Sequence, residues 1–169
     1  MEKFNLREFD KNKNGFEFSK FLDDGSLQEQ FGTEFGFVEK IYPVDSWFYL
    51  YKVFYPNTNI KASGLLFKKG DCRSGIWTFW EEDGKIKNQV DYDKPFKMTF
   101  DSILKFLKTQ NIIFTKDDAI NSIKRFAEEN KGVWSVNWRE SQGRIETMEI
   151  SDDDCKILEK SFYPTKEDD

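Results

Sequence analysis

The sequence predicts an α+β fold, in which antiparallel, aromatic-rich β-hairpin repeats are followed by two helices and a three-stranded antiparallel meander. Residues 1–95 hold short aromatic and β-branched runs between turn signals, a pattern typical of antiparallel hairpins. After residue 95 the apolar residues recur at helical spacing and later return to short alternating runs. We therefore expect a β-rich lobe over residues 1–95 and an α+β lobe over residues 96–169, not an alternating parallel sheet.

The strands of the first lobe are predicted from composition and turn chemistry. Residues 1–46 predict one or two short strands, because an aromatic run over residues 16–22 precedes an Asp-Asp-Gly turn. Residues 47–55 combine aromatic and β-branched side chains, which is typical of a well-buried strand. A turn then leads to a further strand over residues 60–67.

A period of about 25 residues relates two hairpins of this lobe. Val53–Tyr55 and Ile60–Lys61 correspond to Thr78–Trp80 and Ile86–Lys87. Aromatic residues flank a turn that contains Asn or Gly, and helical spacing is absent, so the repeated unit is predicted to be a β-hairpin.

The segment Gly75–Lys87 resembles the bacterial variant of the MORN repeat, whose pattern is roughly G-x-W-x-x-Y/W-x-x-x-G-K-I/L. The resemblance covers about residues 50–93, with Asn59 in the degraded copy where glycine is expected. It implies a binding or spacing element and not a catalyst, and some such repeats belong to antitoxin-like bacterial proteins. Residues 115–163 are similar in pattern to PepSY-type domains, which are binding or inhibitory modules.

The second lobe is predicted to begin with two helices. Thr99 can cap a helix over residues 100–108, and Thr115 can cap a second one that ends before Gly132. Their apolar stripes are Phe100, Ile103, Leu104 and Leu107, and Ala119, Ile120, Ile123, Phe126 and Ala127. Three strands are expected to follow, at residues 133–138, 144–150 and 156–163.

Composition excludes several classes of function. The 169 residues include no histidine and two cysteines, which excludes His-dependent nucleophilic catalysis, His-ligated zinc and a four-cysteine zinc site. The 26 basic and 31 acidic residues give a net charge of −5, which disfavours direct nucleic-acid binding. Asp10–Gly15 imitates half of a calcium loop, but Phe21 stands where the closing Glu should be, so we expect a turn and no metal site.

Acidic hairpin tips are the candidate partner-binding surface, because clustered carboxylates complement a basic partner. These residues are Glu81, Glu82, Asp83, Asp91, Asp93, Asp152, Asp153 and Asp154. The alternative is that turn tips are simply polar and keep the protein soluble.

Two tryptophans, Trp77 and Trp80, are candidate anchors for the same partner. An even loop at Gly84 would turn Trp80 outward beside Lys87, whereas a three-residue loop with a bulge at Gly84 would pair it with Ile86 in the core. The usual burial of tryptophan favours the second arrangement.

These observations lead to the expectation of a non-catalytic binding protein without cofactors. The first residues lack an apolar leader and no apolar stretch reaches about 20 residues, so a cytosolic protein is expected. The expected function is that of an immunity or antitoxin protein that plugs a basic toxin, such as a nuclease, without contacting nucleic acid or membrane. The alternatives are a MORN-like scaffold that binds an unrelated partner and a His-free enzyme that uses carboxylates.

Overall fold

The chain forms two compact units in the computed structural model. The first unit comprises Met1–Lys68 and Arg73–Tyr92, and the second comprises Lys69–Cys72 and Asp93–Asp169. The structure describes residues 1–70, 72–112, 114–115, 121–128, 131–141 and 144–164. The chain passes between the units three times, after Lys68, after Cys72 and after Tyr92. The prediction has a single boundary, at residue 95.

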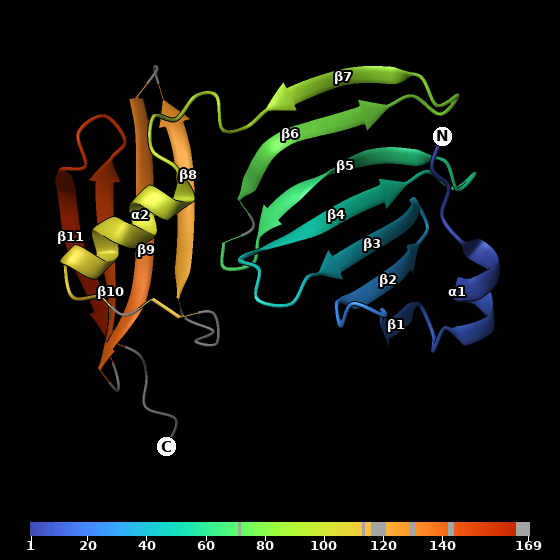
Figure 1. The fold of residues 1–169 in the computed structure, drawn as a ribbon, viewed down its shortest axis with the longest axis horizontal. Helices are drawn as coiled ribbons and strands as arrows, with labels where there is room; N and C mark the ends of the chain where they lie inside the picture. Colours follow the sequence, from blue (N-terminus) through green and yellow to red (C-terminus); the bar gives the residue numbers. More distant parts are fainter. Residues whose placement is uncertain (71, 113, 116–120, 129–130, 142–143, 165–169) are drawn as a thin grey trace. The chain divides into compact units, whose positions relative to one another are not determined.

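The first unit is one seven-stranded antiparallel sheet with a short helix, α1 (Leu6–Asn12), beside it (Figure 1). Each strand pairs with the next one in the chain, so the sheet is a continuous meander. Its strands are β1 (Glu17–Phe21), β2 (Leu27–Thr33), β3 (Gly36–Tyr42), β4 (Phe48–Phe54), β5 (Ile60–Phe67), β6 (Arg73–Trp80) and β7 (Ile86–Asp91).

The strands predicted from residue 47 onward are confirmed, but the part before it differs from the prediction. Three strands lie there and not one or two, and α1 precedes them. The side chain of Asn5 caps α1 by accepting from the Glu8 backbone N–H at 3.2 Å, and Phe9 anchors the helix with 2% exposure. The tight connection between β2 and β3 needs Gly36, whose φ is +128°.

Apolar side chains are buried on both faces of this sheet, because side chains alternate along each strand. On one face Phe4, Phe9, Phe54 and Ile60 form a cluster, in which the ring of Phe4 stacks on Phe37 at 4.4 Å. On the other face Tyr49, Leu66 and Trp77 form a second cluster. Helix α1 contributes Phe9 to the first cluster only.

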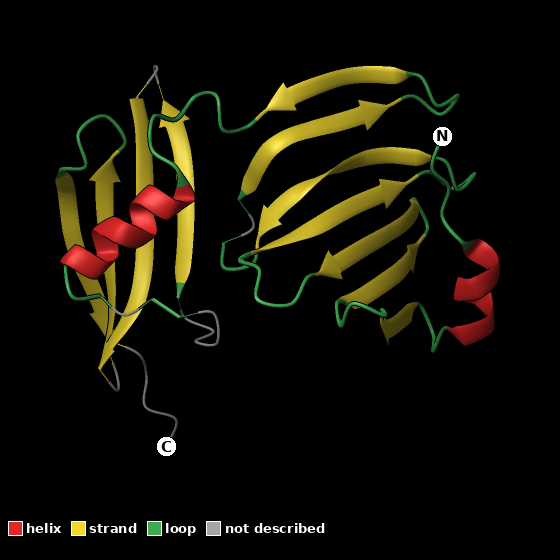
Figure 2. Cartoon of the chain, in the orientation of Figure 1, coloured by secondary structure: helices red, strands yellow, loops and turns green. Residues whose placement is uncertain are grey.

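The second unit packs one helix, α2 (Phe100–Thr109), against a four-stranded antiparallel sheet (Figure 2). The strand order is β11-β10-β9-β8. The bounds are β8 (Ser122–Glu128), β9 (Lys131–Ser141), β10 (Arg144–Ser151) and β11 (Ile157–Pro164). The predicted Thr99 cap is confirmed, since its hydroxyl accepts from the Ser102 N–H at 3.2 Å, and the three-stranded meander is present as β9 to β11.

The second predicted helix of this unit is wrong where the structure describes it. Residues 122–128 form β8, and residues 116–120 lie outside the described part of the chain. Ile123 is fully buried opposite Val136 while Lys124 is exposed, which is the two-residue period of a strand. The fold is therefore mixed, as predicted, and strand-dominated, with one helix and four strands among the described residues of this unit where the prediction has two helices and three strands.

One close contact inside the first unit requires glycine at position 64, because a larger residue would collide with a neighbouring ring. The indole of Trp77 lies against Gly64 of β5, where an added Cβ would lie 2.3 Å from the indole Nε1. The same Nε1 donates to the Leu65 carbonyl at 3.1 Å, so the ring cannot move away without losing this bond.

We expect Gly64→Ala to lower the free energy of unfolding by about 1–3 kcal/mol through overpacking. Urea denaturation followed by tryptophan fluorescence measures the change. The control Ser63→Ala, in the same strand, should cost less than about 1 kcal/mol; equal losses for the two variants would contradict the close contact.

Candidate protein-binding surfaces

The hairpin of β6 and β7 carries the predicted acidic tip. Its loop closes with a Glu81 N–H bond to the Lys85 carbonyl at 2.9 Å, and Gly84 has a φ of +86°. Trp80 pairs with Ile86 across a register shift, so the bulged loop forms and not the even one. Sequence reasoning thus anticipated this loop as one of two alternatives.

The two predicted tryptophan anchors belong to the core clusters of the first unit. Trp77 is 2% exposed, so in this conformation it is not offered to a partner. Trp80 is half-buried and packs against the cluster of Phe4, Phe9, Phe54 and Ile60. Its carbonyl accepts the Tyr55 hydroxyl at 2.8 Å, which ties the hairpin to β4.

The acids at this tip are largely paired with lysines of the same hairpin. Asp83 forms an ion pair with Lys85 at 2.7 Å, and Glu81 forms one with Lys87 at 3.3 Å. The hydrogen bond from the Lys85 side chain holds the pKa of Asp83 below its ordinary value, and the same bond raises the pKa of Lys85. Glu82 is exposed beside them. The local charge is therefore mostly compensated.

The other predicted acids are divided between the units. Asp91 lies exposed at the end of β7 in the first unit. In the second unit, Asp93 pairs with Arg125 at 2.5 Å, and Asp153 pairs with Lys97 and Asp154 with Lys156, both at 2.7 Å. The structure thus does not unite the eight acids in one patch.

Asp152 lies inside the second unit, not on the surface where the sequence predicts it. It is 2% exposed, and its carboxylate accepts from the Trp134 indole N–H at 2.8 Å. It also accepts from the backbone N–H groups of Lys97 and Met98 at 2.6 and 2.9 Å. Asp152 therefore joins the turn between β10 and β11 to the segment that leads into α2.

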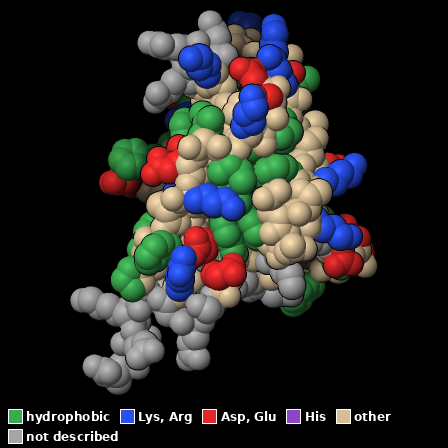
Figure 3. Space-filling view, turned by 90° about the vertical axis from the view of Figure 1, so that its left-hand side faces the viewer, with side chains coloured by type: hydrophobic (Ala, Val, Ile, Leu, Met, Phe, Trp, Pro, Cys, Tyr) green, Lys and Arg blue, Asp and Glu red, His purple; other side chains and the backbone are tan. Residues whose placement is uncertain are grey.

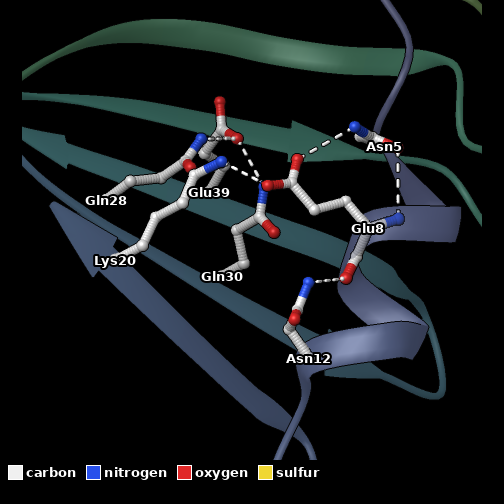
Figure 4. Close-up of polar contacts among 7 residues, drawn as sticks. All are labelled: Asn5, Glu8, Asn12, Lys20, Gln28, Gln30 and Glu39. Atoms are coloured by element: carbon white, nitrogen blue, oxygen red, sulfur yellow. Dashed lines mark hydrogen bonds and ion pairs between the residues drawn. The ribbon is translucent and has the colours of Figure 1, made fainter. Parts of the chain in front are cut away.

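A polar cluster that sequence reasoning missed lies on the first sheet near α1 (Figure 4). Glu39 is 8% exposed, and its Oε2 accepts from Gln28 and Gln30 at 2.6 and 2.7 Å. Lys52 lies 3.4 Å from Oε1 of Glu39 and pairs with Glu2 at 2.5 Å. Burial by itself would lower the pKa of Lys52, but the hydrogen bond to Glu2 and the two carboxylate charges raise it.

Glu39 fixes the orientation of both glutamines, because a carboxylate only accepts hydrogen bonds. The two amide groups point their N–H groups at Glu39, and their oxygens have no hydrogen-bond partner among the described residues. These oxygens are closed to solvent, so the cluster holds the sheet in register and is not an open ligand site. Its sequence signal is the polar pair at positions 28 and 30, one strand period apart.

An open hollow of about 470 Å³ lies beside edge strand β1. Its lining residues are Asn12, Asn14, Glu17, Phe18, Ser19, Glu29 and Phe31. This lining contains two carboxylates and no Lys or Arg, and among the described residues neither Glu17 nor Glu29 forms an ion pair with a cation. Such a surface accepts hydrogen bonds and cationic groups.

Three phenylalanines are strongly exposed around this edge of the sheet. Phe16, Phe21 and Phe35 are 78, 77 and 75% exposed. Phe16 directly precedes β1, Phe21 is the last residue of β1, and Phe35 lies in the connection between β2 and β3. We call Phe16, Glu17, Phe21, Glu29 and Phe35 the β1 surface. Exposed aromatic side chains beside polar groups are typical of protein interfaces.

A second hollow, of about 380 Å³, lies at the end of α2 over β9 and β10. Its carboxylates already accept from this chain: Glu140 from the Trp138 indole at 2.9 Å, and Glu146 from Arg144. The guanidinium of Arg144 also stacks on Phe162 at 4.1 Å. This hollow therefore offers less unpaired acceptor capacity than the β1 surface.

Comparisons with models of protein families, with curated proteins and with solved structures found no match. The MORN-like and PepSY-like resemblances thus remain predictions.

No helix in the described ranges is both long and apolar enough to cross a bilayer. Within those ranges no three Cys, Asp or Glu side chains gather as they would around a metal ion, and Asp10 to Asn12 of the calcium-like segment belong to α1.

We expect Asp152→Asn to lower the free energy of unfolding by at least about 2 kcal/mol, because one amide oxygen cannot replace a carboxylate that accepts three bonds. Thermal and urea denaturation measure this loss. The neighbouring control, Asp153→Asn, breaks an exposed ion pair and should cost about 0–1 kcal/mol. A loss no larger for Asp152 than for Asp153 would show that the buried carboxylate is not needed.

Proposed function

We propose that this protein is a non-catalytic immunity or antitoxin protein, which binds a bacterial toxin in the cytosol and blocks the toxin's active site. The observation that carries the proposal is the β1 surface: Phe16, Phe21 and Phe35 are each at least 75% exposed along this edge strand and the adjoining turn, and the hollow at the same strand is lined by Glu17 and Glu29. Solvent-exposed phenylalanines become favourable when a partner removes them from water. The resemblance to antitoxin-like MORN variants supports the choice of partner.

The partner's expected chemistry follows from the same surface. Unpaired carboxylates and amide oxygens in the hollow favour Lys or Arg side chains, whose aliphatic stems can pack on Phe18 and Phe31. A nuclease presents such cations where it holds substrate phosphates. Occlusion of this basic cleft would inhibit the toxin without any reaction on the immunity protein.

The acidic tip of β6 and β7 is a weaker contributor in this proposal than the sequence suggests. Exposed ion pairs are worth about 0–1 kcal/mol, so a partner's cation can replace Lys85 or Lys87 at little cost. The gain from such an exchange is equally small. The tip would therefore adjust orientation and encounter rate more than affinity.

Substitution of the exposed phenylalanines tests whether the β1 surface binds the partner. We expect Phe16→Ser and Phe35→Ser each to raise the dissociation constant for a partner co-purified from the native cells by about tenfold or more, as loss of a buried interface aromatic does. Surface plasmon resonance measures affinity. The free energy of unfolding should change by less than about 1 kcal/mol because both side chains are already exposed.

The control for these variants is Ile76→Ser, which removes an apolar side chain that is 63% exposed on β6. It should leave the affinity unchanged. If all three variants bind equally well, the β1 surface is not the interface. Inhibition of the partner's toxic activity by the wild-type protein is the companion measurement that separates an immunity protein from a passive binder.

Neutralising the hairpin tip tests the charge contribution. The triple variant Glu81→Gln, Glu82→Gln and Asp83→Asn should slow association with a basic partner by about two- to tenfold and flatten its salt dependence. A matched variant that neutralises Asp10, Asp23 and Asp101, all exposed, changes the net charge equally. Identical kinetics for the two triple variants would show that only net charge matters and that the tip has no local role.

A MORN-like scaffold is the second candidate function. The observation that favours it is the repeated hairpin geometry, in which β4–β5 and β6–β7 follow one another in the meander with a shift in register in each pair. A scaffold would bind its partner without suppressing the partner's activity. The activity measurement above therefore distinguishes the two candidates.

A further inference from the structure

β1 lies at the edge of the first sheet, and the direction of its backbone hydrogen bonds follows from the bonds at its start. Among the described strands it pairs only with β2. The Gly32 N–H donates to the Phe16 carbonyl at 2.8 Å. Because bonded and non-bonded residues alternate along an antiparallel pair, the even-numbered residues of β1 bond to β2. The backbone N–H and C=O groups of Glu17, Ser19 and Phe21 therefore point away from the sheet.

The chain itself uses the first of these outward positions and leaves the other two open. Asn14 forms an antiparallel bridge with Glu17: the Asn14 N–H donates to the Glu17 carbonyl at 2.8 Å, and the Glu17 N–H donates to the Asn14 carbonyl at 3.2 Å. Ser19 and Phe21 are exposed, and no strand in the described part of the chain pairs with their outer side. An edge with free backbone donors and acceptors is a template for a strand of another protein.

Carboxylates lie at both ends of this open stretch. Glu17 precedes Ser19 on the same face of the strand, Glu29 lies directly opposite Ser19 on β2, and Asp23 follows Phe21. None of the three acids forms an ion pair with a described cation. The hollow of about 470 Å³ is lined by Ser19 and both glutamates, so a long basic side chain that crosses Ser19 would meet two carboxylates.

We propose that the partner adds an antiparallel strand to β1, with a Lys or Arg opposite Ser19, an apolar residue opposite Phe21 and a second Lys or Arg beside Asp23. This inference rests on the proposed function, because it states how the β1 surface holds the toxin. The apolar residue covers the ring of Phe21, which is 77% exposed. The antiparallel direction lets Ser19 and Phe21 each exchange both backbone bonds with one partner residue.

β11, at the edge of the second sheet, selects a partner less sharply. All eight of its residues are exposed. Viewed from the side on which β11 lies in Figure 1, hydrophobic side chains appear at the surface among basic and acidic ones (Figure 3). Glu159 and Lys160 of β11 carry opposite charges, so neither sign of partner is favoured there. The cation of β1, Lys20, is already paired with Glu8, and the unpaired charges at this edge are negative. A basic partner strand is therefore favoured at β1.

A short peptide tests the strand addition without the toxin. The probe is acetyl-Lys-Thr-Ile-Thr-Arg-amide, whose Arg and Ile are expected opposite Ser19 and Phe21. It is titrated into the full ¹⁵N-labelled chain and followed by NMR. The amide protons of Ser19 and Phe21 should shift downfield and exchange more slowly with solvent. We expect a dissociation constant on the order of millimolar, because only about four backbone hydrogen bonds form.

Two comparisons separate backbone pairing from attraction between charges. The same peptide N-methylated at its Ile and Arg keeps every side chain but loses the N–H groups that face β1, so it should bind at least about tenfold more weakly. Ser19→Pro removes one outward N–H and leaves the bonds to β2 intact, and it should weaken binding of the unmodified peptide by about tenfold or more. Ser19→Ala, the matched control, keeps the N–H and should bind within about threefold of wild type. Circular dichroism checks that both variants fold.

Each outcome decides the matter, and the comparison of the two peptides needs no variant. Unchanged amide signals of Ser19 and Phe21 at about 10 mM peptide overturn the strand addition. Equal binding of the two peptides, or of the Ser19→Pro and Ser19→Ala variants, overturns it as well. Inhibition of the toxin by Ser19→Pro as strong as by wild type would exclude the added strand and leave the proposed function standing. Peptide binding at β1 by a chain that inhibits no toxin would contradict the immunity role alone.

Discussion

The first unit is a single layer of strands, and this constraint governs the rest of its structure. A sheet without a second layer has to bury apolar side chains on both of its faces, or leave one face in water. The chain does so with two clusters: one closed by Phe4 and by Phe9 of α1, the other built around Trp77. The close contact of the Trp77 indole with Gly64 belongs to this second cluster, and the guanidinium of Arg73 lies 4.6 Å from the same ring.

A single layer of sequential strands also needs a determinant of register, and a polar row across the sheet provides it. Gln30, Glu39, Lys52, Ser63, Thr78 and Gln89 are successive cross-strand neighbours from β2 to β7. A slip of one residue would move Glu39 to the opposite face and away from Gln30 and Lys52. The buried oxygens of Gln28 and Gln30, which have no hydrogen-bond partner in the described part of the chain, cost about 1–3 kcal/mol each.

The parts of the fold that local signals specify were predictable. Strong alternation and turn residues identify β4 to β7, and the Thr99 cap and its apolar stripe identify α2. β8 was not predictable, because Ile123 and Phe126 also fit helical spacing and only pairing with β9 decides between the two periods. α1 was missed because seven residues with one buried side chain carry almost no periodic signal.

The candidate binding surfaces could be predicted only in part from the sequence. Polar, charged turns were identified, but three consecutive aspartates look alike in the sequence. Asp152 turns inward because Trp134, Lys97 and Met98 offer it three donors, and these residues are 18 to 55 positions away in the chain. Such donors come together only after the second unit folds. The exposed phenylalanines were equally hidden, since an aromatic residue in a strand pattern is normally assigned to the core.

The local pairing of surface charges changes what the acidic character of this protein can do. A net charge of −5 spread over two units, with the tip acids paired to Lys85 and Lys87, gives a weak field beyond about 8 Å at physiological salt. Long-range steering would then be modest, and affinity has to come from apolar area removed from water at contact. The exposed phenylalanines of the β1 surface offer that area.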